Sequence, residues 1–485
     1  MIHLYTSTRK KLNLASKFCI EKGISTDGGL FIKDKYDDYD LKEEDKNLDY
    51  LQLTKKIFRY YFADFSDEEI EEVISNGYNS NNFSEKLYHL QSFNDYAFLE
   101  LYHGPTMAFK DMALTILPHL LNKSKGKGTK KTLILTATSG DTGGAALSGF
   151  SNAKDVSVIV LYPTDGVSHF QEHQMQYYTN DHNMAIAVNG NFDDCQNLVK
   201  KIFNSDIKLN NYELSSANSI NIGRLIPQIV YYFASYYEMV RQNKIIYGEK
   251  INFVVPTGNF GNILACYLAK KMGLFIDKIV CASNENDVLT DFFHKGVYDK
   301  NRLFKVTDSP AMDILISSNL ERLLYLASNN DCDVVKHYME ELKNNNLYKI
   351  EDDTKKNLKD FLASSVNNEK TLDLIKKCYK DNHYLIDPHT AVAYGAYLDL
   401  KEQLNGKTVI VSTASPYKFL DAMRKAFNIS GSDHDVINKL NVMISNKEPE
   451  IMNKILNNKF NKTIWQKEEM EEKLIKLIGD IDGKN

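Results

Sequence analysis

The chain has 485 residues, of which 43% are hydrophobic and 25% are charged, and its formal net charge at pH 7 is −5. This composition is ordinary for a globular protein, and the length predicts about two to three domains. The near-balance of charges gives no indication of the broad basic surface that nucleic-acid binding requires, so we expect no nucleic-acid partner.

The N-terminal stretch and the cysteines indicate where the protein works. Residues 1–19 lack the continuous apolar segment of a secretory signal, and no apolar run reaches the about 18 residues of a membrane span. The six cysteines form no CxxC pair, which disfavours a disulfide framework and a cysteine zinc site. No HExxH motif indicates a metal site either. We therefore expect a cytoplasmic protein without membrane or metal.

The first part of the chain, residues 1–95, is polar and predicts a small N-terminal domain. Within it, STDGGLFI (25–32) predicts a glycine turn that leads into a short strand. Residues 67–78 predict a helix that ends near Gly77.

From residue 96 onward, short apolar runs alternate with helical patterns. Strands are predicted at 95–102, 130–138, 156–162, 250–256 and 407–414, and helices at 108–123, 142–150, 263–273 and 417–427. This alternation predicts βαβ units and mostly parallel sheets, an α/β fold. Two helical, charged regions complete the chain: an elaboration at about 330–380 and a tail from 431, which we interpret as solvated helix.

Four loops that follow predicted strands are rich in Gly, Ser, Thr or Asn. They read HGPTMAFK (103–110), TSGDTGG (138–144), PTGNFGN (256–262) and STASP (412–416). A single loop of this kind is usually no more than a turn or a helix cap. Four of them, at the strand ends where open α/β sheets bind ligands, favour a shared anionic ligand held by helix N-termini. Neither GxxxxGK[ST] nor GxGxxG occurs, which disfavours ATP and dinucleotides.

Lys110 lies in the segment HGPTMAFKDMAL (103–114), where an ammonium group is unexpected. Lone lysines are usually solvated, but this one neighbours Phe109 and Met112, close to a helix start predicted near Ala108. A cation in a first turn opposes the helix dipole by about 0.3–1 kcal/mol, and apolar burial lowers a lysine pKa. The resulting neutral amine is what Schiff-base chemistry needs. Pyridoxal phosphate supplies both an aldehyde for this amine and a phosphate for a Gly-rich loop.

The sequence resembles the threonine synthase family, in its longer, fungal-like branch. The likeness rests on segments that run in the family's order from about residue 26 to 425. They are DGGLF, LYHGPTMAFKD, TATSGDTGGAAL, NSINIGRLIPQIVYYF, FVVPTGNFGNILA, SNENDVL, SPAMDILISSNLERLL, DPHTAVAY and STASPYKFLDA. The resemblance implies a fold type II pyridoxal phosphate enzyme, similar to the tryptophan synthase beta chain.

The resemblance also implies a domain plan beyond the N-terminal domain. A large cofactor-binding domain is expected from residues 96–125 and 225–430, and a small substrate-closing domain from 126–224. Residues 431–485 are expected to form the C-terminal helical tail.

Site residues follow from the matched motifs. Lys110 matches the Schiff-base lysine and proton shuttle, and Thr413 matches the hydroxyl at the pyridine nitrogen. The residues that match the family's loop for the cofactor phosphate are Gly258, Asn259, Phe260, Gly261 and Asn262. The segment for the substrate α-carboxylate matches Ser139, Gly140, Asp141 and Thr142, and the segment near the substrate phosphate supplies Asn218, Ser219, Asn221 and Arg224. Arg224 is favoured as the phosphate partner because a guanidinium binds phosphate in a bidentate manner.

The implied activity is conversion of O-phospho-L-homoserine and water into L-threonine and phosphate, by a monomer or homodimer. One departure from the family is Ser415, which replaces the histidine of STAHP. His389, in DPHTA, is interpreted as a structural hydrogen-bonding residue, and His103 is kept out of the catalytic set.

Two alternatives stay open. Another fold type II lyase, such as a threonine dehydratase-like or phospholyase-like enzyme, would share Lys110 and the glycine loop, and NSINIGR (218–224) argues against it. A non-catalytic small-molecule sensor built on the same scaffold would tolerate loss of Lys110.

Overall fold

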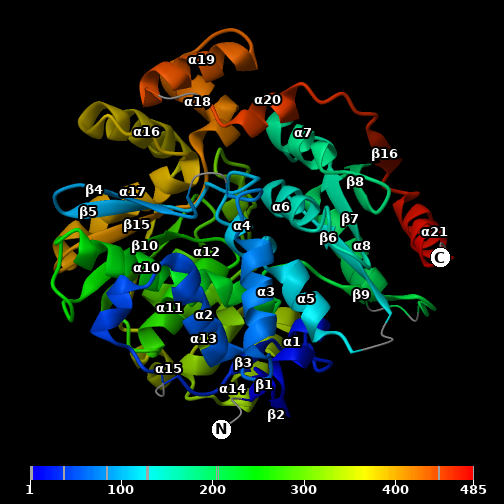
Figure 1. Cartoon of the computed structure of the whole chain (residues 1–485), viewed down its shortest axis with the longest axis horizontal. Coiled ribbons are helices and arrows are strands. Elements are labelled where there is room, and N and C mark those ends of the chain that lie inside the picture. Colours follow the sequence, from blue (N-terminus) through cyan, green and yellow to red (C-terminus); the bar gives the residue numbers. More distant parts are fainter. Residues whose placement is uncertain are drawn as a thin grey trace.

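The computed structural model describes residues 4–483, apart from residues 37–38, 84–85, 127–129, 204, 206 and 446–447. Its strands form two large, mainly parallel sheets, a small antiparallel sheet and a two-stranded ribbon, and helices surround both large sheets (Figure 1). This arrangement confirms the predicted α/β fold with mostly parallel sheets. Among the described residues, no helix is both long enough and apolar enough to cross a membrane.

The first large sheet has six strands in the order β14–β11–β10–β15–β5–β4. In that order they span Phe361–Ser365, Ile276–Ser283, Ile251–Pro256, Thr408–Ser412, Tyr96–Glu100 and His89–Ser92. Every neighbouring pair is parallel except β4 with β5. The carboxyl ends of β5, β10 and β15 therefore meet at one edge, where the loops with Lys110, Gly258 and Thr413 follow them.

The second large sheet has five parallel strands in the order β16–β8–β7–β6–β9. In that order they span Thr463–Gln466, Asn183–Asn189, Val156–Pro163, Lys131–Ala137 and Tyr212–Ser215. Every residue of β7 is buried, as expected for the centre of a sheet with both faces covered.

Each large sheet has its own set of helices. Around the six-stranded sheet lie α10 (Pro227–Arg241), α11 (Gly261–Lys271), α12 (Val288–Lys295), α13 (Leu320–Ala327) and α17 (Pro388–Leu400). Against the five-stranded sheet lie α6 (Asp141–Gly149), α7 (His169–Tyr177) and α8 (Phe192–Phe203). The helix predicted at 108–123 is in fact two, α4 (Asp111–Leu114) and α5 (Leu117–Ser124), and Pro118 lies in the first turn of the second.

The N-terminal part contains an antiparallel sheet and three helices. The strands are β1 (Tyr5–Ser7), β2 (Lys10–Leu14) and β3 (Phe31–Lys33), and the helices are α1 (Ser16–Lys22), α2 (Tyr50–Tyr61) and α3 (Asp67–Gly77). The strand predicted at 25–32 appears as β3, and the helix predicted to end near Gly77 ends there. These helices pack on α5, α10 and the short α9 (Ile222–Leu225). Strand β4 falls within the expected N-terminal range but pairs with β5 in the large sheet.

The elaboration expected at 330–380 is helical only in part. Its helices are α14 (Cys332–Asn345), α15 (Asp352–Lys356) and α16 (Asn368–Asn382). Between them, β13 (Leu347–Lys349) pairs with β12 (Val297–Asp299), and β14 forms an edge of the six-stranded sheet. The prediction missed these strands because β13 is short and β14, with the sequence FLASS, is only weakly apolar.

The tail from residue 431 is largely helical, as predicted, but the prediction that it is solvated is wrong. After α18 (Leu420–Phe427), the chain forms α19 (Asp433–Ile444), α20 (Glu450–Leu456), strand β16 and α21 (Met470–Gly483). Figure 1 shows this orange-to-red segment crossing from the top of the molecule to the five-stranded sheet at the right. There β16 pairs with β8, and α21 buries Leu474, Ile478 and Ile481 against the sheet. The tail is amphipathic, and its apolar residues complete a core.

Candidate active site

Lys110 lies at the end of the loop that follows β5, immediately before α4 begins at Asp111. Backbone contacts hold this loop against the end of β15, because Phe109 N–H donates to Thr413 O (2.8 Å) and Ala108 forms an isolated bridge with Ala414. Lys110 therefore precedes the helix, whereas the sequence predicted it within a first turn that began near Ala108. The lysine is only 9% exposed, which bears out its predicted burial.

Asp111 fixes the turn that presents Lys110. Its carboxylate accepts hydrogen bonds from the Thr106 N–H (2.8 Å) and the Thr106 hydroxyl (2.5 Å). Burial raises the pKa of Asp111 to about 6, although the hydrogen bonds from Thr106 oppose this rise. The carboxylate is thus a structural acceptor next to the lysine.

Three charged groups influence the Lys110 amine, and one of them contacts it. Asp141 Oδ2, from the first turn of α6, lies 3.4 Å from Lys110 Nζ. Burial lowers the pKa of Lys110, and the nearby cations Lys418 and Arg224 lower it further, whereas Asp141 opposes the shift. The lowered pKa agrees in direction with the prediction from the sequence and favours a neutral amine.

Asp141 is held by more than Lys110. Lys418 Nζ lies 2.9 Å from Asp141 Oδ1, and Gln171 Nε2 donates to the same oxygen (3.0 Å). Burial alone would raise the pKa of Asp141, but Lys418 and Lys110 outweigh that effect and hold the pKa far below its ordinary range. Asp141 is therefore a buried anion that faces two lysines.

The glycine loop after β10 requires a residue without a side chain at Gly258. A Cβ atom there would lie 2.5 Å from Ala311 O, closer than real contacts allow. Ser317 Oγ donates to Gly258 O (2.6 Å), and Asn319 Nδ2 donates to Asn259 O (2.9 Å). At the end of the loop, Phe260 adopts a left-handed backbone (φ 61°), and α11 begins at Gly261. The loop thus presents a helix N-terminus, which is a site for anions.

One buried donor in this loop has no partner within the described part of the chain. Asn262 Oδ1 accepts hydrogen bonds from the hydroxyls of Tyr231 (2.5 Å) and Tyr232 (2.6 Å). Its Nδ2 group is buried and has no acceptor among the residues that the structure describes. A buried NH₂ next to a helix N-terminus is a group that a phosphate would satisfy. The glycine cradle and this donor fit the phosphate of pyridoxal phosphate.

Thr413 lies at the carboxyl end of β15 and is 5% exposed. Its carbonyl accepts the hydrogen bond from Phe109, which joins it to the residue before Lys110. The structure thus brings Thr413 and Lys110 together at one sheet edge, as predicted. Ser415, which replaces the family's histidine, caps the short 3₁₀ helix Pro416–Lys418 through its hydroxyl.

The loop after β6 contains the expected carboxylate-binding residues. Gly140 has φ 127°, and a Cβ atom there would lie 2.4 Å from the Gln171 side chain, so both conformation and space require glycine. Thr138, which the sequence did not single out, accepts hydrogen bonds from the N–H groups of Gly140 (3.0 Å) and Gly143 (2.9 Å). Ser139 and Thr142 flank this turn and are partly exposed.

Residues 218–224 lie beside the glycine loop. Asn319 Nδ2, which contacts Asn259, also donates to Ser219 Oγ (3.0 Å). Asn218 Oδ1 accepts from the Thr136 hydroxyl (2.9 Å), which connects the segment to β6.

Arg224 is the charged residue of this segment and is only 2% exposed. Its Nη1 donates to Ala217 O (2.8 Å), while its buried Nε has no partner among the described residues. Burial lowers the pKa of Arg224 to about 10, so the guanidinium remains charged at neutral pH. A buried cation with an unpaired donor suits an anionic ligand.

Asn221 makes its hydrogen bonds within the protein. Its Oδ1 accepts from Gly223 N–H (2.9 Å), and its Nδ2 donates to Ile20 O (2.9 Å) in the N-terminal part. Both polar atoms are engaged and the residue is fully buried. Asn221 caps α9, which carries Arg224.

Both histidines considered from the sequence have protein partners. His389 Nδ1 lies 2.8 Å from Asp387 Oδ2, and His389 Nε2 accepts from Ala311 N–H (3.2 Å). His389 is therefore a structural hydrogen-bonding residue, as predicted. It holds the backbone of Ala311, whose carbonyl oxygen leaves no room for a side chain at Gly258. His103 Nε2 lies 2.9 Å from Glu100 Oε2.

Sequence reasoning missed Lys418 and Asn319. Both lie inside quoted motifs, STASPYKFLDA and SPAMDILISSNLERLL, but neither has a distinctive local pattern. Their importance comes from contacts with Asp141 and with the glycine loop, which are distant in the sequence.

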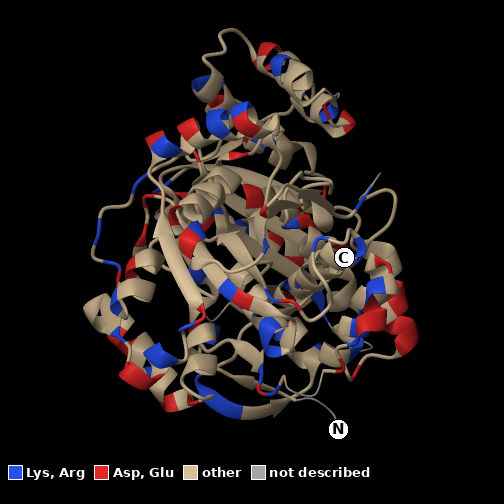
Figure 2. Ribbon diagram, turned by 90° about the vertical axis from the view of Figure 1, so that its left-hand side faces the viewer, with Lys and Arg blue, Asp and Glu red and all other residues tan. Residues whose placement is uncertain are grey.

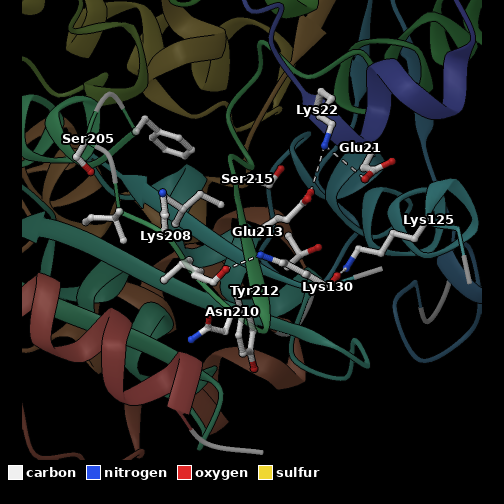
Figure 3. Close-up of a pocket in the computed structure, with 15 residues that line it drawn as sticks. Glu21, Lys22, Lys125, Lys130, Ser205, Lys208, Asn210, Tyr212, Glu213 and Ser215 are labelled. Carbon is white, nitrogen blue, oxygen red and sulfur yellow. Dashed lines mark hydrogen bonds and ion pairs between the residues drawn. The ribbon is translucent and has the colours of Figure 1, made fainter. Parts of the chain in front are cut away.

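The outer surface offers weaker candidates. Figure 2 shows acidic and basic segments intermixed on the face drawn. A hollow of about 600 Å³ beside β9 is lined by Lys22, Lys125, Lys130 and Lys208 (Figure 3). Lys22 pairs with Glu213 (3.2 Å), and the amines of Lys125 and Lys130 donate to backbone carbonyls, so three of these four cations are already engaged. Among the described residues, no group of three or more His, Cys, Asp or Glu side chains could hold a metal ion.

Comparisons with known proteins agree with this site. The family model described as pyridoxal-phosphate dependent enzyme matches residues 86–415, and the model of the threonine synthase N terminus matches residues 4–78. The chain is 38% identical to threonine synthase of Saccharomyces cerevisiae, over 88% of this chain and 89% of that protein.

Two solved structures resemble the whole chain. The crystal structure of yeast threonine synthase has a TM-score of 0.87 at 34% identity and covers 100% of this chain and 98% of that one. The structure of pyridoxal phosphate-bound threonine synthase from Brucella melitensis has a TM-score of 0.87 at 30% identity and covers 99% of each chain.

Proposed function

Since the chain belongs to the threonine synthase family of pyridoxal-phosphate dependent enzymes, we propose that it converts O-phospho-L-homoserine and water into L-threonine and phosphate. The observation that carries the proposal is the position of Lys110. Its buried amine lies 3.4 Å from Asp141 and in the field of the cations Lys418 and Arg224, at the sheet edge that also holds the glycine loop.

Six residues besides Lys110 would hold the cofactor. The N–H groups of Gly258, Asn259, Phe260 and Gly261, with the Asn262 Nδ2 group, would bind its phosphate, and Thr413 would contact its ring nitrogen. When bound, pyridoxal phosphate supplies an aldehyde for an amine and a ring that accepts electron density from the substrate. A hydroxyl at the ring nitrogen, unlike a carboxylate, leaves the ring less electron-withdrawing.

Lys110 is proposed as the proton carrier. Its lowered pKa favours the neutral amine, which can remove a proton from the substrate α-carbon and then from the β-carbon. Phosphate leaves from the γ-carbon, and a proton is added there to form the methyl group. Water then adds its hydroxyl at the β-carbon and gives its proton to the released phosphate, and return of a proton to the α-carbon completes threonine. Burial of the amine keeps bulk water away from these steps.

The substrate's two anionic ends require different partners. Arg224, Asn218 and Ser219 would hold the substrate phosphate, since the buried Arg224 Nε has no partner among the residues that the structure describes. The α-carboxylate would meet Ser139, Thr142 and the backbone at Gly140. Asp141, although it lies in this segment, carries a negative charge that would repel a carboxylate, so we assign it to Lys110. Asn221 would hold α9 in place as its N-terminal cap.

The proposal extends to domains and cellular context. Residues 1–95 would form the N-terminal domain, and residues 96–125 and 225–430 would form the large domain. Residues 126–224 would form a small domain that closes over the substrate. We propose a cytoplasmic monomer or homodimer without nucleic-acid or membrane partners. All six cysteines are unpaired, which suits a reducing compartment.

A product assay tests this function. Purified protein with pyridoxal phosphate should release threonine and phosphate in equal amounts from O-phospho-L-homoserine. Lys110→Ala should abolish both, whereas Lys425→Ala, which changes an exposed lysine in α18, should not. Release of phosphate with ketobutyrate and no threonine would favour the lyase alternative. Full activity of Lys110→Ala would contradict the proposed mechanism.

A further inference from the structure

Lys418 is a fully buried cation in the candidate active site. It ends the 3₁₀ helix Pro416–Lys418, and none of its surface is exposed. Its Nζ donates to Thr106 O (2.9 Å) and to Gln174 Oε1 (3.1 Å), and it lies 2.9 Å from Asp141 Oδ1. An ammonium group has three N–H donors, so these three acceptors satisfy it completely. Three acceptors therefore hold the Lys418 amine in one position.

The two oxygens of the Asp141 carboxylate face different lysines. Its Oδ1 is engaged by Lys418 and by Gln171 Nε2 (3.0 Å), whereas its Oδ2 faces Lys110 Nζ at 3.4 Å. The shorter ion pair is the one with Lys418. Lys110 therefore shares its counter-ion with a second cation.

We propose that Lys418 is a positioning residue that binds the Asp141 carboxylate and so prevents it from acting as a full counter-ion for the Lys110 amine. The consequence depends on the proposed function, because Lys110 acts as a base only when its nitrogen is unprotonated. Lys418 itself need not touch the substrate or the cofactor.

The surrounding charges support this role. The charged groups that face the Lys110 amine are Asp141 from α6, Lys418 from the 3₁₀ helix and Arg224 from α9. His389 from α17 also contributes to the field at Asp141. Lys418 and Arg224 disfavour a proton on Lys110, and Asp141 favours one. Without Lys418, the Asp141 carboxylate would form an ion pair with Lys110 alone.

The contacts of Lys418 also connect the two large sheets. Thr106 belongs to the loop before Lys110, whereas Asp141 and Gln174 belong to α6 and α7 beside the five-stranded sheet. Ser415 N–H donates to Met107 O (3.1 Å), which holds the 3₁₀ helix on the same loop. Lys418 is therefore placed by the elements that place Lys110 and Asp141.

The test is a pH titration of the holoenzyme of Lys418→Met without substrate. The visible absorption of the bound cofactor reports the protonation of the Lys110 nitrogen. Loss of a nearby positive charge favours the protonated nitrogen, so the titration midpoint should move upward by about one pH unit. The lower limb of the kcat–pH profile should move in the same direction. Lys425→Met, an exposed lysine change, should leave both unchanged.

The Asp141→Asn variant distinguishes an effect of Lys418 that acts through Asp141 from an effect that acts directly on Lys110. In Asp141→Asn protein the carboxylate charge is gone, so adding Lys418→Met should shift the midpoint much less than it does alone. An unchanged midpoint in Lys418→Met, or an equal shift in both backgrounds, would overturn the proposal. If Lys418→Met does not fold, Lys418→Gln removes the charge but keeps a hydrogen-bond donor and gives the same test.

This titration is independent of the reaction catalysed. A protein that binds the cofactor but forms no threonine would contradict the proposed function and still report the Lys110 midpoint. A protein that forms threonine with an unshifted midpoint would contradict only the role of Lys418.

Discussion

The Lys110 amine lies 3.4 Å from the Asp141 carboxylate, although the two residues follow strands of different sheets. Lys110 follows β5 of the six-stranded sheet, and Asp141 follows β6 of the five-stranded sheet. Both side chains are buried, so their charges interact with little screening by water. The reactive amine therefore depends on how the two sheets meet, and substitutions on either side should change it.

Gly258→Ala should weaken cofactor binding. The added Cβ would lie 2.5 Å from Ala311 O, so the loop must shift and its N–H groups must move with it. If the bound state carries a strain of about 1–3 kcal/mol, binding should be roughly fivefold to 150-fold weaker. Titration with pyridoxal phosphate, followed by absorption, measures this. The control is Gly479→Ala, where a Cβ meets no described residue within 4 Å, and equal affinities for the two variants would contradict the prediction.

Arg224→Met should raise the KM for O-phospho-L-homoserine. Loss of a charged hydrogen bond of about 1.5–3 kcal/mol predicts an increase of roughly tenfold to hundredfold, with a smaller change in kcat. Steady-state kinetics provide the measurement. Arg59→Met removes an arginine from the exposed Asp67 pair and should leave KM unchanged. An unaltered KM in Arg224→Met would argue that the substrate phosphate lies elsewhere.

Asp111 should make stability depend on pH. Its pKa in the folded protein, about 6, lies above the ordinary value of 3.8, so folding favours the protonated carboxyl. This contribution is present below about pH 4 and is lost as pH rises through about 6, by about 3 kcal/mol.

The Asp111→Asn variant isolates this effect, because its amide does not titrate. Wild type should lose stability relative to the variant between about pH 4 and pH 7, as measured by urea unfolding at several pH values. A constant difference between the two proteins across this range would show that Asp111 does not titrate as predicted.

The C-terminal helix should be required for the core of the five-stranded sheet. Ile478 is 1% exposed, and Ile478→Ala should destabilise this core by about 2–5 kcal/mol. Trp465, the one tryptophan of the chain, lies in the same core and reports its opening by fluorescence. The emission change should occur at lower urea than in wild type. Ile475→Ala, which changes an exposed residue of the same helix, should behave like wild type, and similar midpoints for both variants would contradict the prediction.

Local sequence patterns were enough to predict much of the candidate active site. Lys110, the glycine loop at 258–262 and Thr413 follow predicted strands, and parallel strands bring their carboxyl ends to one edge. Long-range contacts could not be predicted in this way. Nothing near Lys418 in the sequence indicates that its amine meets Asp141.

The same distinction holds for the fold. The strands at 130–138, 156–162 and 250–256 have continuous apolar runs, and each appears within about one residue of its predicted limits. Strand β16 has the sequence TIWQ, which is too short for a pattern, and it is a strand because β8 offers an edge. Asn221 looked like a ligand-binding amide, but packing of Ile20 against α9 gives its side chain two backbone partners.

The most direct test of the account is to identify the lysine that carries the cofactor. Holoenzyme treated with sodium borohydride, digested and analysed by mass spectrometry should carry the reduced cofactor on the peptide that contains Lys110. The neighbouring buried lysine, Lys418, should remain unmodified. Label on Lys418 or on any other lysine, with none on Lys110, would contradict the central claim.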